Sequence, residues 1–255
     1  MNRWSCYFAT VLIAAMLAAL PNGAGAQTCE LELKIVDETY SPETAMVRTV
    51  NAQSISRQLT GAEVAASDPT TASLPSFDDV ISTDRDDYQL NEPFRGVAKF
   101  GDHSYGFVVD GELNKTTTIF GPVVGDNGVV TYMESEIELK IPAFDKLYFD
   151  LNRNGDLTDD EPIESTMFFV TPLANPDFPL AVSSDFPRVE LEVETDGTTY
   201  DYAFAFMISG IGNSSCNSAK ASFTSASYRE GVITVDGEEK TVALVDFNSN
   251  GRFDD

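Results

Sequence analysis

Residues 150–161 read D-L-N-R-N-G-D-L-T-D-D-E, and this segment constrains the chain most because it spaces oxygen-bearing side chains as a hard cation requires. In the twelve-position calcium-loop pattern, oxygens at positions 1, 3, 5, 7, 9 and 12 surround the ion, and a glycine at position 6 makes the sharp turn. The residues at these ligand positions are Asp150, Asn152, Asn154, Asp156, Thr158 and Glu161. The segment therefore predicts a calcium loop, with Gly155 at the turn and Leu157 packed inward as an anchor.

The ligand positions differ in what they contribute. Asp156 is expected to provide its main-chain carbonyl, as position 7 normally does. Thr158 would bind directly or through a water, and Glu161 would close the site with both carboxylate oxygens. Asparagine at positions 3 and 5 lowers the ligand charge, so we expect a weak, structural site with a dissociation constant of about 0.1 to 1 mM.

The end of the sequence repeats the opening of this loop as D-F-N-S-N-G-R-F-D-D. Each copy directly follows an apolar run, and two such copies in one chain are hard to attribute to chance. The predicted ligands of the second copy are Asp246, Asn248, Asn250, Arg252 and Asp254, with Arg252 at position 7. The printed sequence reaches position 10 of the pattern, so the closing carboxylate of position 12 is missing unless Asp255 or a distant residue substitutes for it, and we expect this second site to be weaker.

The first loop resembles the EF-hand calcium loop, but its flanks do not resemble the usual helices. The entering run of Leu147, Tyr148 and Phe149 is short and aromatic, and Pro162 disfavours an exiting helix. In this respect the segment is similar to the strand-flanked D-x-N-x-N-G loops of secreted and cell-surface calcium proteins. It is also similar to segments of acidic secreted bacterial proteins of unassigned function. The resemblance implies calcium binding through the residues named above, and it gives no information about a catalysed reaction.

The first 26 residues have the features of a secretory signal peptide. Arg3 precedes an apolar run over residues 7–20, and small residues follow at 24–26. That run is shorter than the roughly 20 residues needed to span a bilayer. We therefore expect cleavage after Ala26, a secreted or periplasmic location, and no membrane span. Cys29 and Cys216 could then form one disulfide, with free thiols as the alternative.

The formal net charge of the chain is −25, which argues against nucleic acid and anionic membranes as partners. Acidic charge also keeps an exported protein soluble, so part of the excess needs no ligand. The clustering of acids in the two loops nevertheless favours a cation. The predicted partners are calcium and, beyond it, another secreted or cell-surface protein or a glycan.

Short alternating strands and Asx-Gly turns predict an all-β fold, a β-sandwich or open barrel. We expect a strand within residues 27–40, a linker or loosely ordered arm over 41–87 with a short helix near 43–59, and two β units. These units would cover residues 88–171 and 172–255, each ending in a calcium loop. One side of the most apolar strand is predicted to be a packed core face, formed by Tyr200, Tyr202, Phe204, Phe206 and Ile208. The small residues on its opposite side suggest that this second face is also covered.

Catalysis is the competing functional class. His103 is the only histidine in the chain, and its setting favours a solvent-exposed turn over a general base. A glycosidase-like hydrolase needs only two carboxylates about 5 to 10 Å apart, which sequence spacing does not report. Asp84, Asp86 and Asp87 are the densest acids outside the loops, and a solvated turn explains them better. A calcium-dependent carbohydrate-binding module is a third alternative.

Overall fold

A computed structural model describes residues 29–36, 53–58, 74–112, 115–124, 130–139, 142–172, 180–212 and 217–254. The all-β prediction is confirmed, and the sheets are antiparallel and sandwich-like. The elements are β1 (Glu32–Ile35), β2 (Gln53–Gln58), α3 (Phe77–Val80), β3 (Phe94–Phe100), β4 (His103–Asp110), β5 (Thr116–Val124), β6 (Val130–Glu138), β7 (Lys146–Phe149), β8 (Ile163–Glu164), β9 (Met167–Pro172), β10 (Leu180–Asp185), β11 (Val189–Thr195), β12 (Thr198–Gly212), β13 (Asn217–Ser225), β14 (Ser227–Val235) and β15 (Glu238–Val245).

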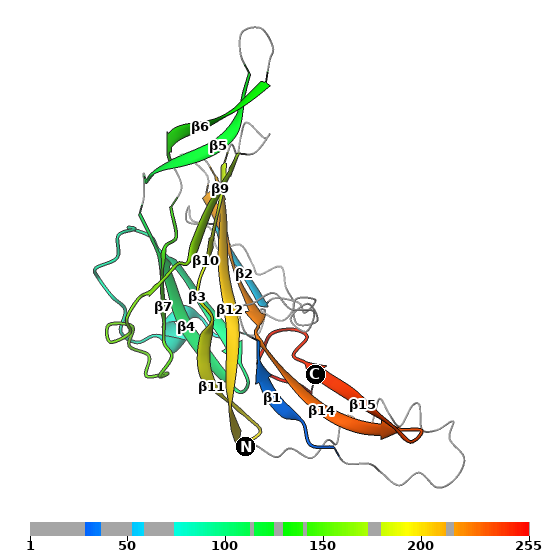
Figure 1. The fold of residues 1–255 in the computed structure, drawn as a ribbon. Coiled ribbons are helices and arrows are strands. Elements are labelled where there is room, and N and C mark those ends of the chain that lie inside the picture. The colour runs from blue at the N-terminus through cyan, green and yellow to red at the C-terminus, as the bar shows by residue number, and fades with distance from the viewer. Residues whose placement is uncertain are drawn as a thin grey trace.

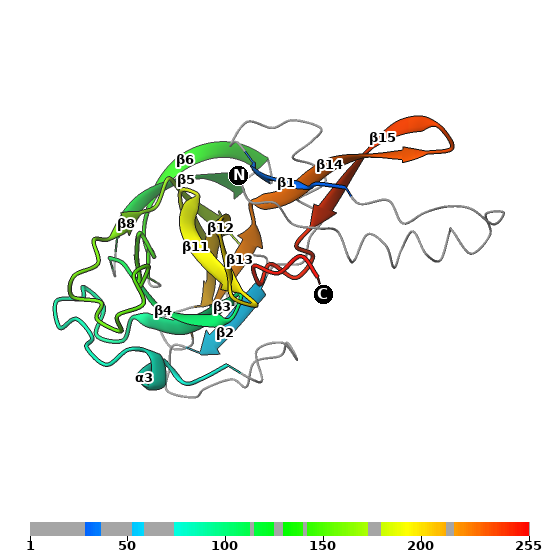
Figure 2. The same cartoon turned by 90° about the horizontal axis from the view of Figure 1, so that it is seen from below.

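Two sheets form the body of the molecule. One has the strand order β3-β4-β7-β8, and the other runs β2-β13-β12-β10-β9, with β11 paired to β12. Two smaller groups of strands extend from this body at opposite ends in Figure 1, the hairpin β5–β6 and the sheet β1-β14-β15. Viewed from below, α3 lies beside the β3–β4 edge of the body (Figure 2).

Aromatic side chains from both large sheets form one core. The ring of Phe100, at the end of β3, stacks on Phe204 of β12 with centroids 4.8 Å apart. Phe149, the last residue of β7, lies 5.3 Å from Phe204 and 6.2 Å from Phe223 of β13. The predicted core face of β12 is confirmed, because Tyr200, Tyr202, Phe204, Phe206 and Ile208 are all buried.

The expected cover on the opposite face of β12 is not found over its whole length. Ala203 is buried, whereas Ala205 is exposed and Met207 is 40% exposed. Small residues at these positions allow a close neighbour but do not require one. Sequence periodicity therefore identified the buried face correctly and misjudged the other.

Asx-Gly dipeptides form hairpins at two of the predicted places. Asp196 and Gly197 have φ values of 51° and 74° and join β11 to β12, and Asp236 and Gly237, at 54° and 81°, join β14 to β15. Positive φ at both central residues matches the right-handed twist of the strands. The dipeptide at 110–111 does not form a hairpin, since β4 pairs with β3 and β7 and not with β5, the next strand along the chain. The buried Asp110 carboxylate instead accepts hydrogen bonds from the main-chain N–H groups of Gln89 and Leu90.

Two elements lie in the described part of residues 41–87, the segment expected to be a linker or loosely ordered arm. Strand β2 pairs with β13, and α3 begins with a capping box in which Ser76 and Asp79 exchange hydrogen bonds. The polar composition of this segment hid both elements, since their partners lie far away in sequence. The two expected β units also share a single core, and so they are not separate domains.

Several predictions concern residues outside the described ranges. These are the signal peptide over residues 1–26, most of the suggested helix near 43–59, and Cys216, so the disulfide to the buried Cys29 stays a prediction. Among the described residues, no helix is both long enough and apolar enough to cross a membrane.

The Phe100→Ala variant tests the aromatic core. Phe100 has no exposed surface, so its truncation should lower the free energy of unfolding by about 3 to 5 kcal/mol. Phe247, which is 55% exposed, is the matched control, and Phe247→Ala should change that free energy by less than about 0.5 kcal/mol. Urea unfolding of both variants gives the comparison, and equal losses would contradict this description of the core.

Candidate calcium site

Asp150, the first predicted ligand, directly follows β7 and is only 1% exposed. The core fixes its position, because Phe149 is packed among the aromatic rings immediately before it. Its Oδ1 accepts a hydrogen bond from the N–H of Asn154 at 3.1 Å, and its Oδ2 accepts one from the N–H of Gly155 at 3.0 Å. Burial nevertheless raises the pKa of the Asp150 carboxyl, since these N–H donors offset only part of the lost hydration.

The next predicted ligands form a regular series along the loop. The side-chain oxygen of Asn152 accepts from the N–H of Asn154 at 2.9 Å, and that of Asn154 accepts from the N–H of Asp156 at 2.8 Å. Asp156 Oδ1 accepts from both the N–H and the hydroxyl of Thr158. The carboxylate of Asp156 is thus engaged within the loop, which agrees with a main-chain contribution at position 7.

Gly155 is required by the backbone at the turn of the loop. Its φ is +72°, and a Cβ at this position would lie 2.9 Å from the carbonyl oxygen of Val80. The Gly155 carbonyl accepts hydrogen bonds from the N–H groups of Ser82 and Thr83, at 2.8 and 3.0 Å. The loop is therefore packed directly against residues 81–83.

The second half of the loop is held by the same neighbouring segment. The N–H of Leu157 donates to the carbonyl of Thr83 at 3.0 Å, next to a parallel bridge between Thr83 and Asp156. As predicted, Leu157 is fully buried, and it packs with Ile81 and Tyr148. The segment around Thr83 thus acts as the partner strand of the loop, which no pattern in the sequence indicated.

Asp160, which the sequence pattern did not select, carries a carboxylate close enough to Asp150 for the two charges to interact. Its Oδ2 is buried and has no hydrogen-bond partner. Burial first, and then the charges of Asp150 and Asp159, raise the pKa of the Asp160 carboxyl to about 6. Glu161, the predicted closing ligand, is exposed. Two adjacent acids at positions 11 and 12 cannot be distinguished by composition, because the turn before Pro162 decides which one faces inward.

The cations near the first loop form no ion pair with the carboxylates of Asp150 and Asp160 in the described part of the chain. Arg85 and Arg95 pair with Asp87 and Asp84 at 2.9 Å each, and Arg153 lies in the loop itself and lines a hollow together with Asp150. Among the described residues, no ion pair reaches Asp150 or Asp160. The arrangement can accept a cation, and the residues present fit calcium, which prefers carboxylate, amide and main-chain oxygens.

The second loop opens in the same way but has more internal partners. Asp246 is fully buried, and its carboxylate accepts from the N–H groups of Asn250 and Gly251. In addition, the hydroxyl of Tyr202 donates to Asp246 Oδ2 at 2.6 Å. Burial raises the pKa of Tyr202, so its hydroxyl keeps the proton that it donates. Asn248 is half-buried, and its oxygen accepts from the N–H of Asn250.

Arg252 gives the second loop a cation of its own. Its guanidinium binds both carboxylate oxygens of Asp254 at 3.0 Å, Asp102 at 3.1 Å and Asp196 at 3.0 Å. Asp102 lies in the β3–β4 turn and Asp196 in the β11–β12 turn, so one side chain ties two turns to the loop. The carboxylate of Asp254, a predicted ligand, is therefore already bound to the Arg252 guanidinium.

The groups considered for catalysis are engaged in structural contacts. Asp84 accepts from Arg95 and from the hydroxyl of Tyr88, and Asp87 pairs with Arg85, while Asp86 is exposed. His103 is the first residue of β4 rather than part of the preceding turn. Its Nε2 lies 3.1 Å from a carboxylate oxygen of Glu194. This is an ion-pair geometry at the surface and supplies no nucleophile.

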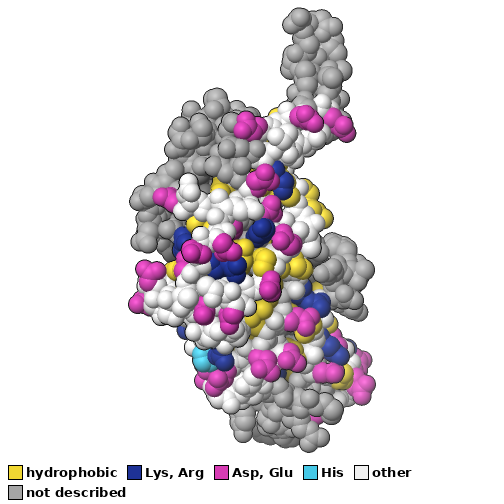
Figure 3. Space-filling model, turned by 90° about the vertical axis from the view of Figure 1, so that its left-hand side faces the viewer, with side chains coloured by type: hydrophobic (Ala, Val, Ile, Leu, Met, Phe, Trp, Pro, Cys, Tyr) yellow, Lys and Arg dark blue, Asp and Glu magenta, His cyan; other side chains and the backbone are white. Residues whose placement is uncertain are grey.

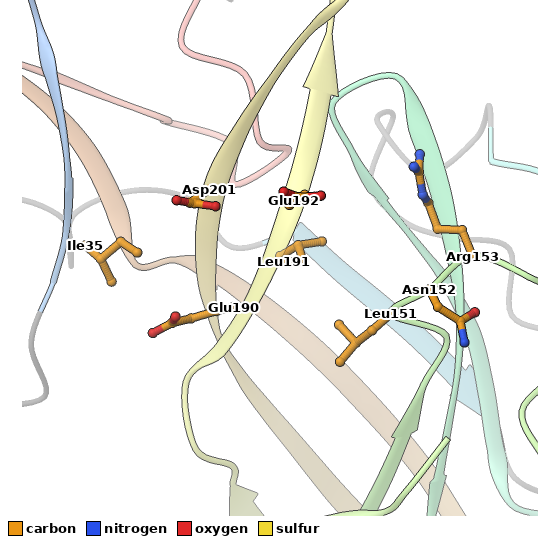
Figure 4. A pocket seen from close by; sticks show the side chains of 8 residues that line it. All are labelled: Ile35, Leu151, Asn152, Arg153, Glu190, Leu191, Glu192 and Asp201. Atoms are coloured by element: carbon orange, nitrogen blue, oxygen red, sulfur yellow. The ribbon is translucent and has the colours of Figure 1, made fainter. Parts of the chain in front are cut away.

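Two open hollows flank the first loop. One, of about 600 Å³, is lined by Asp150 and Asn152 together with His103 and Ser104. The other, of about 470 Å³, includes Glu190 and Asp201. Figure 4 shows Glu190 extending toward Ile35, whereas Asn152 and Arg153 lie on the far side of the hollow from Ile35 and point away from it.

Acidic side chains are spread over the face shown in Figure 3, with fewer Lys and Arg side chains among them. In the described part of the chain, no group of three or more His, Cys, Asp or Glu side chains is placed to hold a metal ion. A calcium loop does not need such a group, because asparagine amides and main-chain carbonyls supply several of its oxygens.

Comparison with known proteins assigns no relative to the chain. No family model matches it, and no match is found among curated proteins or among solved structures. The inference about function therefore depends on the geometry of the two loops.

The Arg252→Ala variant tests whether the second loop is held by its own cation. Loss of this network should lower the free energy of unfolding by about 1 to 2 kcal/mol, because three carboxylates lose a shared partner. The decrease should be the same in calcium and in chelator. Lys240→Ala, which removes an exposed pair with Glu238, is the control and should have little effect. A loss confined to calcium-containing buffer would contradict this account.

Proposed function

We propose that this chain is a secreted calcium-binding β protein in which the first loop holds a structural calcium ion. The observation that carries the proposal is the buried Oδ2 of Asp160, which has no hydrogen-bond partner and lies in the field of Asp150. Two neighbouring carboxylates that are withdrawn from water and have no ion-pair partner are costly, since a carboxylate prefers its charged form to be paired or hydrated. A divalent cation removes this cost.

The ligand set follows from the positions of the oxygens. Side-chain oxygens of Asp150, Asn152, Asn154 and Asp160 and the carbonyl of Asp156 would hold the ion, with Thr158 bound directly or through a water. Glu161 lies next in the chain, at position 12 of the sequence pattern, and is the other candidate for the carboxylate that completes the site. Calcium supplies positive charge at the end of β7 and couples residues 150–161 to the segment around Thr83.

The second loop is a weaker candidate for calcium. Asp246, Asn248, Asn250, Arg252 and Asp254 would form its ligand set, but Asp254 already binds the Arg252 guanidinium and Asp246 already accepts from Tyr202. A cation entering this loop would have to replace contacts that exist without it. We therefore assign the structural ion to the first loop.

The role we propose for the ion is static. Asparagine ligands give the weak affinity typical of extracellular sites, which stay occupied where calcium is abundant. At about 100 times the dissociation constant, calcium would add about 2.7 kcal/mol to the stability of the fold. The protein that carries this site would act as a binding or structural module.

Thermal melts of the purified chain with calcium, with magnesium and with chelator test the proposal. Saturating calcium should raise the melting temperature by about 5 to 10 °C, because about 2.7 kcal/mol shifts a chain of this size by 2 to 4 °C per kcal/mol. Magnesium should do less, since it gives up its waters reluctantly.

Asp150→Asn and Asp246→Asn form the matched pair of variants for these melts. Both keep the shape of the side chain at position 1 of a loop. The calcium-dependent rise should disappear in Asp150→Asn and persist in Asp246→Asn. A rise that survives Asp150→Asn, or an equal rise with magnesium, would overturn the assignment of a calcium site to the first loop.

A further inference from the structure

Arg85 contacts the first loop from outside at the half that carries its last ligands. Its Nη1 donates to the carbonyl oxygens of Leu157, Thr158 and Asp160 at 3.3, 3.4 and 3.2 Å. The side chain is only 19% exposed. One guanidinium group thus contacts three main-chain carbonyls within four residues, in the half of the loop that contains Thr158 and Asp160.

Arg85 is itself fixed by two further contacts. Its Nε and Nη2 donate to the two carboxylate oxygens of Asp87, each at 2.9 Å. Its guanidinium carbon lies 4.7 Å from the centre of the Tyr148 ring. Tyr148 belongs to β7, two residues before Asp150, so Arg85 connects the beginning of the loop to its end.

We propose that Arg85 is a positioning residue that sets the calcium affinity of the first loop and its preference for calcium over magnesium. This inference rests on the function proposed above. Arg85 would act through main-chain carbonyls, which keep Thr158 and Asp160 at a fixed separation from Asp150. A pre-organised loop loses less conformational freedom on binding, and rigid spacing of oxygens favours one ionic size.

The charge of Arg85 does not compete with the ion for ligands. Its carboxylate partner is Asp87, and it approaches the loop only through carbonyl oxygens. Asp87 also neutralises the guanidinium, which limits repulsion of an incoming cation. Lysine cannot reproduce these contacts, because a single ammonium group lacks the planar fork that reaches Asp87 and the carbonyls together.

Isothermal titration calorimetry of the purified chain with calcium and with magnesium, for wild type, Arg85→Lys and Arg95→Lys, tests the proposal. Arg95 is the matched control, because it lies nearby, pairs with Asp84 at 2.9 Å and stacks over Tyr88. Arg85→Lys should weaken calcium binding about tenfold, while magnesium binding changes less. Arg95→Lys should leave both affinities within about twofold of wild type. Melting of each variant in chelator reports the effect on the fold alone.

The possible outcomes separate the two proposals. No calcium binding by the wild-type chain would overturn the proposed function itself. Calcium binding by wild type with equal affinities for Arg85→Lys and Arg95→Lys would overturn the role of Arg85 alone. If Arg85→Lys lowers the melting temperature in chelator but leaves the calcium affinity unchanged, the role of Arg85 is purely structural. If Arg85→Lys lowers the affinities for calcium and magnesium by the same factor, Arg85 does not set the preference for calcium.

Discussion

The stacking of Phe100 on Phe204 joins the two large sheets, and both loops take their positions from this contact. Phe149 packs against Phe204 and leads directly into Asp150. Tyr202, two residues before Phe204 on the same face of β12, carries its hydroxyl to Asp246. A single aromatic interface therefore places the first carboxylate of each loop at the border of the core, where burial makes an uncompensated charge costly.

The two loops begin with the same residue pattern, but their carboxylates are stabilised in different ways. In the second loop the protein provides the compensation, through the hydroxyl of Tyr202 and the guanidinium of Arg252. In the first loop the main chain donates to Asp150, but the Oδ2 of Asp160 remains buried without a partner. Arg85, which contacts this loop, donates to carbonyls and to Asp87. The need for an external cation is thus confined to one loop.

Local sequence predicted those features that depend on neighbouring residues. Alternation identified the buried face of β12, and Asp-Gly dipeptides at 196–197 and 236–237 marked two hairpins, because positive φ is a local property. The spacing of Asp150, Asn152, Asn154 and Gly155 likewise predicted a loop whose side chains accept main-chain hydrogen bonds in series. These patterns need no knowledge of distant partners.

Tertiary contacts determined what the sequence did not predict. The segment around Thr83 looked like part of a polar linker, yet it pairs with the first loop across more than seventy positions of sequence. In the same loop the Oδ2 of Asp160 is buried and Glu161 is exposed. Arg252 occupied a position expected to contribute only a carbonyl, and its side chain proved to be the link among three segments. Each of these outcomes depends on residues that become neighbours only after folding.

A crystal structure of the protein grown with calcium, with anomalous difference density to locate the ion, would show whether the first loop binds calcium. We expect one peak in the first loop, about 2.3 to 2.6 Å from side-chain oxygens of Asp150 and Asp160 and from the carbonyl of Asp156. An empty first loop, or a peak only in the second loop, would contradict this expectation.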